Sequence, residues 1–207
     1  MTNFIPIFPL SIVVFPEETL NLHIFEPRYK QLIKDCHEKN RSFGIPVVIN
    51  KNVMESGTSV EILKIEKIYS NGEMDIVTRG QHVFRILEII KEVPDKLYRG
   101  AIVNYPPNQH EGRETLMKHV LASVRLLHEM LNIHKDFKKE ENQMKTYDIA
   151  HHAGLSLEQE YEFLGLMYEL QRQEYLKRHL KNILPVVAET EALKQKIKMN
   201  GHFRYLN

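Results

Sequence analysis

The chain has 207 residues, of which 43% are hydrophobic and 27% are charged, and its formal net charge is +1 at neutral pH. This length suits one sizeable domain or two small ones with a buried core. The near-zero charge argues against a protein whose main role is to neutralise nucleic-acid phosphates. The single cysteine, Cys36, excludes an internal disulfide and fits a reducing compartment.

Neither a secretory signal nor a membrane span is expected. The first ten residues, MTNFIPIFPL, lack a basic segment followed by an apolar run and a small-residue cleavage site. No apolar run approaches the roughly 20 residues that cross a bilayer. We therefore expect a cytoplasmic protein.

The chain begins with strand-like segments and one helix. Residues 5–15 are rich in β-branched and aromatic residues but are broken by two prolines, which suits an edge or entry strand. Residues 20–24 alternate apolar and polar side chains, as a half-buried strand does. Pro27 fits the first position of a helix. That helix has one apolar stripe, formed by Tyr29, Leu32, Ile33 and Cys36.

The following residues predict further strands, at 43–49, 60–69, 74–78, 83–90 and 98–105. Ser70-Asn71-Gly72 is a hairpin signal, because Asn-Gly tolerates positive φ at low cost. Six or seven short strands with one helix, and no alternation of strand and helix, indicate a closed or rolled sheet.

Beyond Tyr105 the periodicity changes from that of strands to that of helices. We predict a β-rich subdomain over residues 1–105, a Pro- and Asn-containing linker over 106–112 and a helical subdomain over 113–207. Ser156 and Gln159 form a capping-box pattern that opens a long helix. Pro185 is expected to end or kink it, and residues 186–199 form a last helix. The predicted fold class is α+β.

The motifs of common enzymes are missing from the sequence. It has no phosphate-binding glycine loop, no dinucleotide-binding glycine motif, no nucleophile elbow and no H-E-x-x-H metal motif. His151 and His152 are adjacent, so on a helix they point about 100° apart and do not suit one metal ion. For Glu26 and Arg28 a local ion pair or cap is the simplest explanation. We therefore predict no catalytic residue, no metal and no cofactor.

Several motifs resemble the N-terminal domain family of Lon proteases, in the form of its short stand-alone members. The similarity lies in the segment 8–16, FPLSIVVFP, in the segment 20–29, LNLHIFEPRY, and in Phe43-Gly44, Gly57-Thr58, and Gly80 with Arg85-Ile86. It is good over about residues 4–105 and loose beyond. One departure is Val83, which replaces the first arginine of the last motif.

The resemblance implies a PUA-like β-rich subdomain followed by a helical bundle. It also implies a role in engaging substrate proteins, which in full-length Lon proteases accompanies assembly of the hexamer. The ATPase and serine–lysine protease modules of those proteins do not fit in 207 residues. We therefore expect a non-catalytic module that binds exposed polypeptide segments or a protein partner.

Such a site needs a groove with an apolar floor and a polar rim, which we place between the sheet and the helices. The candidates to line it are Phe25, Arg28 and Tyr29 at the strand–helix junction and Tyr105 at the linker. Core packing is the alternative role for each of the aromatic residues.

RNA binding is the alternative function. PUA-like sheets occur in RNA-modifying proteins, and the segment 172–204 contains eight Lys and Arg against three Asp and Glu. A basic C-terminal helix could contact RNA or an acidic partner, although a solvated helix face explains the same charges. The near-neutral net charge, and the lack of an aromatic and basic cluster of the base-stacking type, weigh against nucleic acid.

Overall fold

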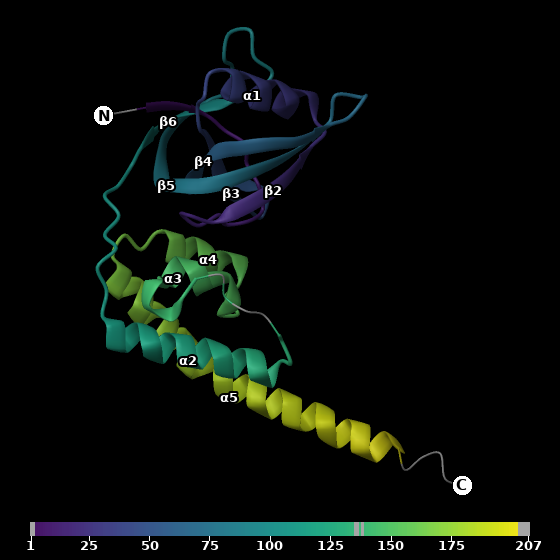
Figure 1. Ribbon diagram of the computed structural model, residues 1–207, viewed down its shortest axis with the longest axis vertical. Coiled ribbons are helices and arrows are strands. Elements are labelled where there is room, and N and C mark those ends of the chain that lie inside the picture. The colour runs from purple at the N-terminus through teal and green to yellow at the C-terminus, as the bar shows by residue number, and fades with distance from the viewer. Residues whose placement is uncertain (1–2, 135–136, 138, 203–207) are drawn as a thin grey trace. The chain divides into compact units, whose positions relative to one another are not determined.

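Six antiparallel strands form one sheet in the first half of the chain (Figure 1). The computed structural model describes residues 3–134, 137 and 139–202, and the side chains up to residue 198. The strands are β1 (Asn3–Pro6), β2 (Thr19–Ile24), β3 (Phe43–Ile49), β4 (Asn52–Ile68), β5 (Met74–Ile90) and β6 (Gly100–Asn104). The helices are α1 (Pro27–Glu38), α2 (Glu114–Met130), α3 (Thr146–Ile149), α4 (Leu157–Leu164) and α5 (Glu169–His202), with short 3₁₀ turns at Glu141–Gln143 and Ala150–His152.

The order of the strands curls the sheet toward a barrel. They pair in the order β1-β6-β5-β4-β3, and β2 pairs with the first part of β5. Parallel bridges from Ile7 to Gly44 and from Leu10 to Val47 then join the segment after β1 to β3. An antiparallel sheet followed by helices confirms the predicted α+β fold class.

Two strands are much longer than the sequence predicted. β4 and β5 have 17 residues each, whereas we expected β5 as two strands separated at Gly80. Gly80 lies inside β5, where its N–H bonds to Glu18 O and its C=O accepts from Glu17 N. A Cβ at Gly80 would lie 2.2 Å from Phe15 O. The glycine therefore allows another backbone segment to cross closely over an unbroken strand.

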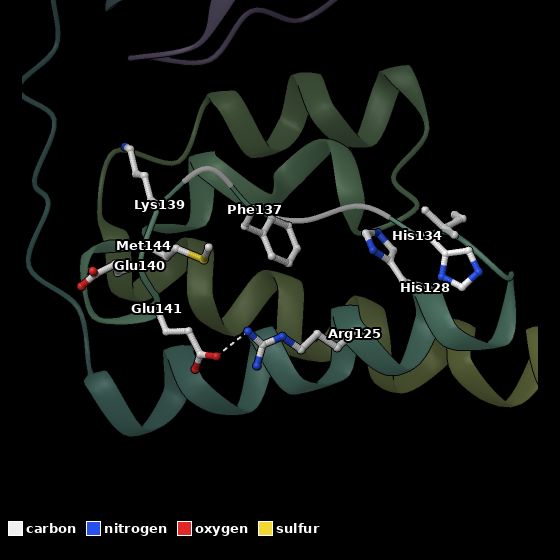
Figure 2. Close-up of a pocket in the computed structure, with 9 residues that line it drawn as sticks. Arg125, His128, His134, Phe137, Lys139, Glu140, Glu141 and Met144 are labelled. Carbon is white, nitrogen blue, oxygen red and sulfur yellow. Dashed lines mark hydrogen bonds and ion pairs between the residues drawn. The ribbon is translucent and has the colours of Figure 1, made fainter.

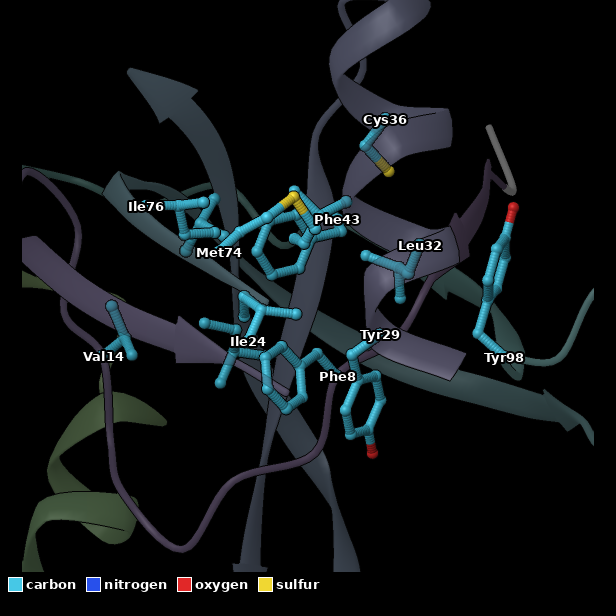
Figure 3. Packing of buried hydrophobic residues seen from close by; sticks show 13 residues of the cluster. Phe8, Val14, Ile24, Tyr29, Leu32, Cys36, Phe43, Met74, Ile76 and Tyr98 are labelled. Atoms are coloured by element: carbon cyan, nitrogen blue, oxygen red, sulfur yellow. The ribbon is translucent and has the colours of Figure 1, made fainter. Parts of the chain in front are cut away.

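The helix α1 forms as predicted and covers part of the core (Figure 3). Pro27 occupies the start of the helix, and all four residues of the predicted stripe are buried. The ring of Phe8 stacks on that of Tyr29 with 3.9 Å between ring centres. Other members of this core are Val14, Ile24, Phe43, Ile45, Val60, Met74, Ile76 and Tyr98.

The chain divides into two units by its internal contacts. The sheet unit contains the residues up to Asn108 together with 156–167, and the helical unit contains 109–155 and the residues from Tyr168 onward. In the helical unit, α2 packs along α5. Their contact buries one stripe of α2 and the α5 residues Leu176 and Leu180.

The predicted long helix after Ser156 is wrong in its extent. The capping box forms, but α4 ends at Leu164 and α5 begins at Glu169. Gly165 is the C-cap residue of α4, and the N–H of Glu169 bonds to Gln109 O in the helical unit, which ties the start of α5 to that unit. α4 belongs to the sheet unit instead, where Phe163 meets the ring of Phe15 edge-on at 5.7 Å.

Pro185 was expected to end or kink this helix; an end there is wrong, because α5 continues through Pro185 to His202. Proline removes one helical hydrogen bond to the carbonyl four residues earlier. Lys181 and Pro185 are both exposed, so water can satisfy that carbonyl and the loss is small. No helix among residues 3–134 and 139–202 is both long enough and apolar enough to span a membrane.

Candidate functional site

Three of the four predicted site residues lie together where β2 leads into α1. Phe25 is 59% exposed. Arg28 bonds to Glu26 through Nε at 2.9 Å and Nη2 at 2.7 Å, which confirms the expected ion pair. Its guanidinium also lies 4.5 Å from the centre of the Tyr29 ring. Tyr29 itself is buried in the core, so it supports the segment from below while Phe25 faces solvent.

Tyr105, the fourth predicted residue, lies elsewhere on the sheet. Phe25 follows Ile24, which pairs with Met74 at one end of β5, whereas Tyr105 follows Asn104, which pairs with Arg85. The ring of Tyr105 meets that of His82 edge-on at 6.1 Å, and partial burial raises the pKa of its hydroxyl. The register thus separates Tyr105 from Phe25 by eleven positions along β5.

A polar network lies beside Phe25 at the end of the β4–β5 hairpin, and together they form what we call the hairpin-end cluster: His23, Phe25, Tyr69, Glu73 and Asp75. His23 lies 2.7 Å from Asp75 through Nδ1 and 3.2 Å from Glu73 through Nε2. Tyr69 donates its hydroxyl to Asp75 Oδ2 at 2.6 Å. The imidazole is nearly parallel to the Phe25 ring at 6.2 Å and edge-on to the Tyr69 ring at 5.9 Å. The exposed phenyl ring therefore has the hydrogen-bonded side chains of His23, Tyr69 and Asp75 on one side.

The charges of this cluster stabilise one another. The hydrogen bond with Asp75 raises the pKa of His23, and Glu73 adds to the effect. The pKa of Asp75 is lowered, first by the hydroxyl of Tyr69 and then by His23. The bond to Asp75 raises the pKa of Tyr69. These interactions are solvent-exposed, so they orient side chains and do not prepare a group for proton transfer.

The cluster is anchored to α1 and bordered by further apolar surface. Lys30 of α1 donates from Nζ to Asn71 O in the hairpin turn at 3.0 Å. Ile68, which ends β4 opposite Met74, is 67% exposed. The strand β2 adds a backbone edge, because its one ladder within the described residues is with β5. That ladder runs without a bulge over six residue pairs.

The helical unit contains a separate open hollow of about 660 Å³ (Figure 2). Arg125 and Glu141, which both line it, form an ion pair, and the rings of His128 and Phe137 stack at 6.0 Å. Its lining includes both charge signs, and neither sign dominates. This arrangement favours no particular ligand.

A buried polar network fixes the start of α5 in the same unit. Glu169 accepts from Thr146 N at 2.9 Å and from Thr146 Oγ1 at 2.8 Å. Arg172, which is fully buried, contacts Glu169 at 2.9 Å and lies over the Tyr147 ring at 4.2 Å. These charges are paired and hydrogen-bonded, as buried charges must be. Their role is to hold the helices of the unit together.

The described residues offer little for catalysis. No group of three or more His, Cys, Asp or Glu among them could hold a metal ion. Burial raises the pKa of the Cys36 thiol to about 11, which leaves it protonated and unreactive near neutral pH.

The sequence analysis named Phe25 as a candidate but did not predict the polar network beside it. His23 and Asp75 are 52 residues apart, and only the β2–β5 register brings them together. The hairpin turn at Asn71-Gly72 was a usable signal, because it fixed where β5 begins. The pairing of β2 with β5 had no counterpart in the sequence pattern.

Comparison with known proteins identifies the chain's relatives. The family described as ATP-dependent protease La (LON) substrate-binding domain matches residues 5–194. Among solved structures, the Lon N-terminal domain protein from Xanthomonas campestris is 26% identical with a TM-score of 0.63, over 84% of this chain and 96% of that one. The N-terminal domain of the Mycobacterium avium complex Lon protease shares the fold at 16% identity and a TM-score of 0.63, over 86% and 98% of the two chains. No curated protein matches the chain.

Proposed function

Because the chain belongs to the substrate-binding domain family of the ATP-dependent protease La (Lon), we propose that it binds exposed polypeptide segments at the hairpin end of its sheet unit. The family membership makes it a substrate-binding module. Our proposal adds that the ligand is a polypeptide and that it binds at the hairpin end of the sheet unit.

The observation that carries the proposal is the exposure of Phe25 on a rigid support. Large aromatic side chains gain most from desolvation when they insert into a partner, and they dominate interface energies. Phe25 is 59% exposed, yet it is fixed between a strand and a helix whose next aromatic residue, Tyr29, is buried in the core. An exposed but pre-positioned ring loses little entropy on binding.

The backbone edge of β2 supports a polypeptide as the ligand. A strand edge presents N–H and C=O groups that an extended chain can pair with, whatever its sequence. β2 ends one residue before Phe25, and its sequence, TLNLHI, contains neither proline nor lysine to block such pairing. Backbone pairing beside an apolar anchor suits tolerant recognition of unfolded segments.

RNA binding through the basic C-terminal helix has less support. Of the cations counted there, Arg172 is buried against Glu169. Lys177 pairs with Glu174 at 3.5 Å and Lys194 with Glu191 at 2.7 Å. These contacts lower the positive charge that the helix presents to phosphates.

Titration with a permanently unfolded polypeptide, reduced and carboxymethylated lactalbumin, tests the proposal. We expect binding that prefers the unfolded over the folded form and weakens little between about 50 and 200 mM salt, whereas RNA binding falls steeply over that range. Phe25→Ser is expected to weaken binding roughly tenfold. Leu87→Ser, at a 55% exposed leucine of β5, is the matched control. Equal losses in both variants would contradict the proposed surface.

A further inference from the structure

The helical unit contains a second hollow, of about 460 Å³, which we call the α2–α5 hollow. It is lined by the end of the segment before α2, by α2 itself, by the 3₁₀ turn Glu141–Gln143 with the two residues after it, and by the start of α5. α2 and α5 pack along one another in this unit (Figure 1). The volume is that of a site for a small organic molecule.

The floor of the α2–α5 hollow is apolar. It is formed by Met117 and Leu121 of α2 and by Met144, which are all buried in the unit. An apolar group that enters the hollow is removed from water against these side chains, and the flexible methionines can adapt to its shape. The floor therefore favours a ligand with an apolar part.

The carboxamide of Gln173 indicates where a polar atom of the ligand would lie. Gln173 is 3% exposed, and its Oε1 accepts from Arg113 N at 2.9 Å. In the described part of the chain its Nε2 has no hydrogen-bond partner, whereas every fully enclosed polar side-chain atom there has one. Nε2 is therefore reached from the hollow that Gln173 lines. A Cβ on Gly112 would lie 2.3 Å from Nε2, so this glycine leaves the amide uncovered.

An unpaired donor in such a place requires an acceptor, because a nearly buried N–H without one is costly. The charges of the lining indicate what kind of acceptor fits. Arg113 and Lys145 are exposed at the rim, and within the described residues neither side chain has an ion-pair partner. Each acidic residue of the lining, in contrast, is paired with a cation: Glu114 with Lys118, Glu141 with Arg125, and Glu169 with Arg172. The excess positive charge favours an anion.

We propose that the α2–α5 hollow binds a small organic carboxylate with a short apolar body. The carboxylate accepts a hydrogen bond from Gln173 Nε2 and is neutralised by Arg113 and Lys145, which makes these bonds charge-assisted. The apolar body lies on the methionines and the leucine of the floor. Inorganic phosphate has no part that this floor would bury, so it is expected to bind more weakly. The site is separate from the sheet unit, where we propose that polypeptides bind.

NMR titration of the full, ¹⁵N-labelled chain with hexanoate tests this inference. We expect a saturable shift of the Gln173 side-chain amide, with a dissociation constant of about 1 mM. Hexanamide, which has nearly the same shape without the charge, should bind at least about fivefold more weakly. Arg113→Gln and Lys145→Gln should each weaken hexanoate binding about fivefold. Lys181→Gln, at an exposed lysine of α5 outside the lining, is the charge-matched control and should have no effect.

Gln173→Glu keeps an acceptor for Arg113 N and replaces the Nε2 donor by a second carboxylate oxygen, so hexanoate binding is expected to disappear at neutral pH. Circular dichroism checks that this variant is folded. An unchanged Gln173 amide at about 50 mM hexanoate would overturn the proposal. Equal affinities for hexanoate and hexanamide would overturn it as well, and so would equal losses in Arg113→Gln and Lys181→Gln. None of these outcomes depends on whether the sheet unit binds polypeptides.

Discussion

At the residue scale, two ion pairs of equal spacing on α5 show how burial determines what an ion pair contributes to stability. Glu169 and Arg172 are almost completely buried, whereas Glu174 and Lys177, also three residues apart, are largely exposed. Removing one partner of a buried pair leaves an uncompensated charge, which costs far more than the loss of an exposed pair.

We therefore predict that Glu169→Gln lowers the free energy of unfolding by about 3–5 kcal/mol, because Arg172 loses its counter-charge while remaining buried. Glu174→Gln, the matched control, should cost less than about 1 kcal/mol. Urea denaturation followed by helical circular dichroism measures both. Similar losses for the two variants would mean that the Glu169 network is not a principal support of the helical unit.

The hairpin-end cluster predicts a pH dependence at His23. Its pKa is raised in the folded protein, so its contribution to stability is complete below the unfolded pKa and is lost as pH rises through the folded one. The pKa of Asp75 is lowered, so its contribution is lost as pH falls through its folded value. NMR titration of the imidazole should show a lower His23 pKa in Asp75→Asn, with a smaller fall in Glu73→Gln. An unchanged midpoint in Asp75→Asn would contradict the network.

At the element scale, β5 depends on a glycine that lets another segment cross it. A methyl group at Gly80 would collide with Phe15 O, and neither backbone can move without breaking the bonds to Glu17 and Glu18. Gly80→Ala is therefore expected to destabilise the sheet unit by about 1–3 kcal/mol. Gly165→Ala, where the nearest atom is 3.2 Å away, should cost less. Thermal unfolding of both variants checks the difference.

The elements that the sequence predicted well are those fixed by local signals. The helix α1 followed from Pro27 and its apolar stripe, and the start of α4 followed from the Ser156 capping box. The extent of β4 and β5 did not, because three register shifts in their ladder interrupt the alternation of apolar and polar residues. The break before Glu169 depends on its contacts with Thr146 and Gln109, which no local pattern encodes.

The candidate site, too, could be predicted only as far as local sequence patterns reach. Phe25 and Arg28 were visible as residues flanking a helix entry. The polar network beside Phe25 requires Asp75 on β5, so it depends on long-range pairing. Burial decided the role of Tyr29, and the apolar spacing of α1 had already favoured the core.

At the scale of the whole molecule, α4 links the two halves of the sequence. It follows the first helices of the helical unit in the chain, yet it belongs to the sheet unit, and its Phe163 is fully buried there beside Phe15. Phe163→Ala should therefore speed amide exchange in β3 and β4 and destabilise that unit by about 3–5 kcal/mol. Leu176→Ala, buried in α5, should affect the helical unit instead. Identical exchange patterns in both variants would show that the two units unfold as one.

The proposed function depends on an exposed residue, Phe25, on the edge of the strand β2 beside it, and on the sheet to which both belong. Each part has a chemical counterpart in an unfolded chain, namely an apolar side chain and a free peptide backbone. Binding of this kind is expected to be weak for any one segment and tolerant of its sequence.

The most direct test is amide hydrogen exchange of the full chain with and without saturating carboxymethylated lactalbumin. We predict slower exchange in β2 and through residues 68–75, and a smaller effect in Phe25→Ser. Slower exchange confined to α5 would contradict the assignment of polypeptide recognition to the hairpin end of the sheet. An unchanged exchange pattern at saturating lactalbumin would contradict it as well.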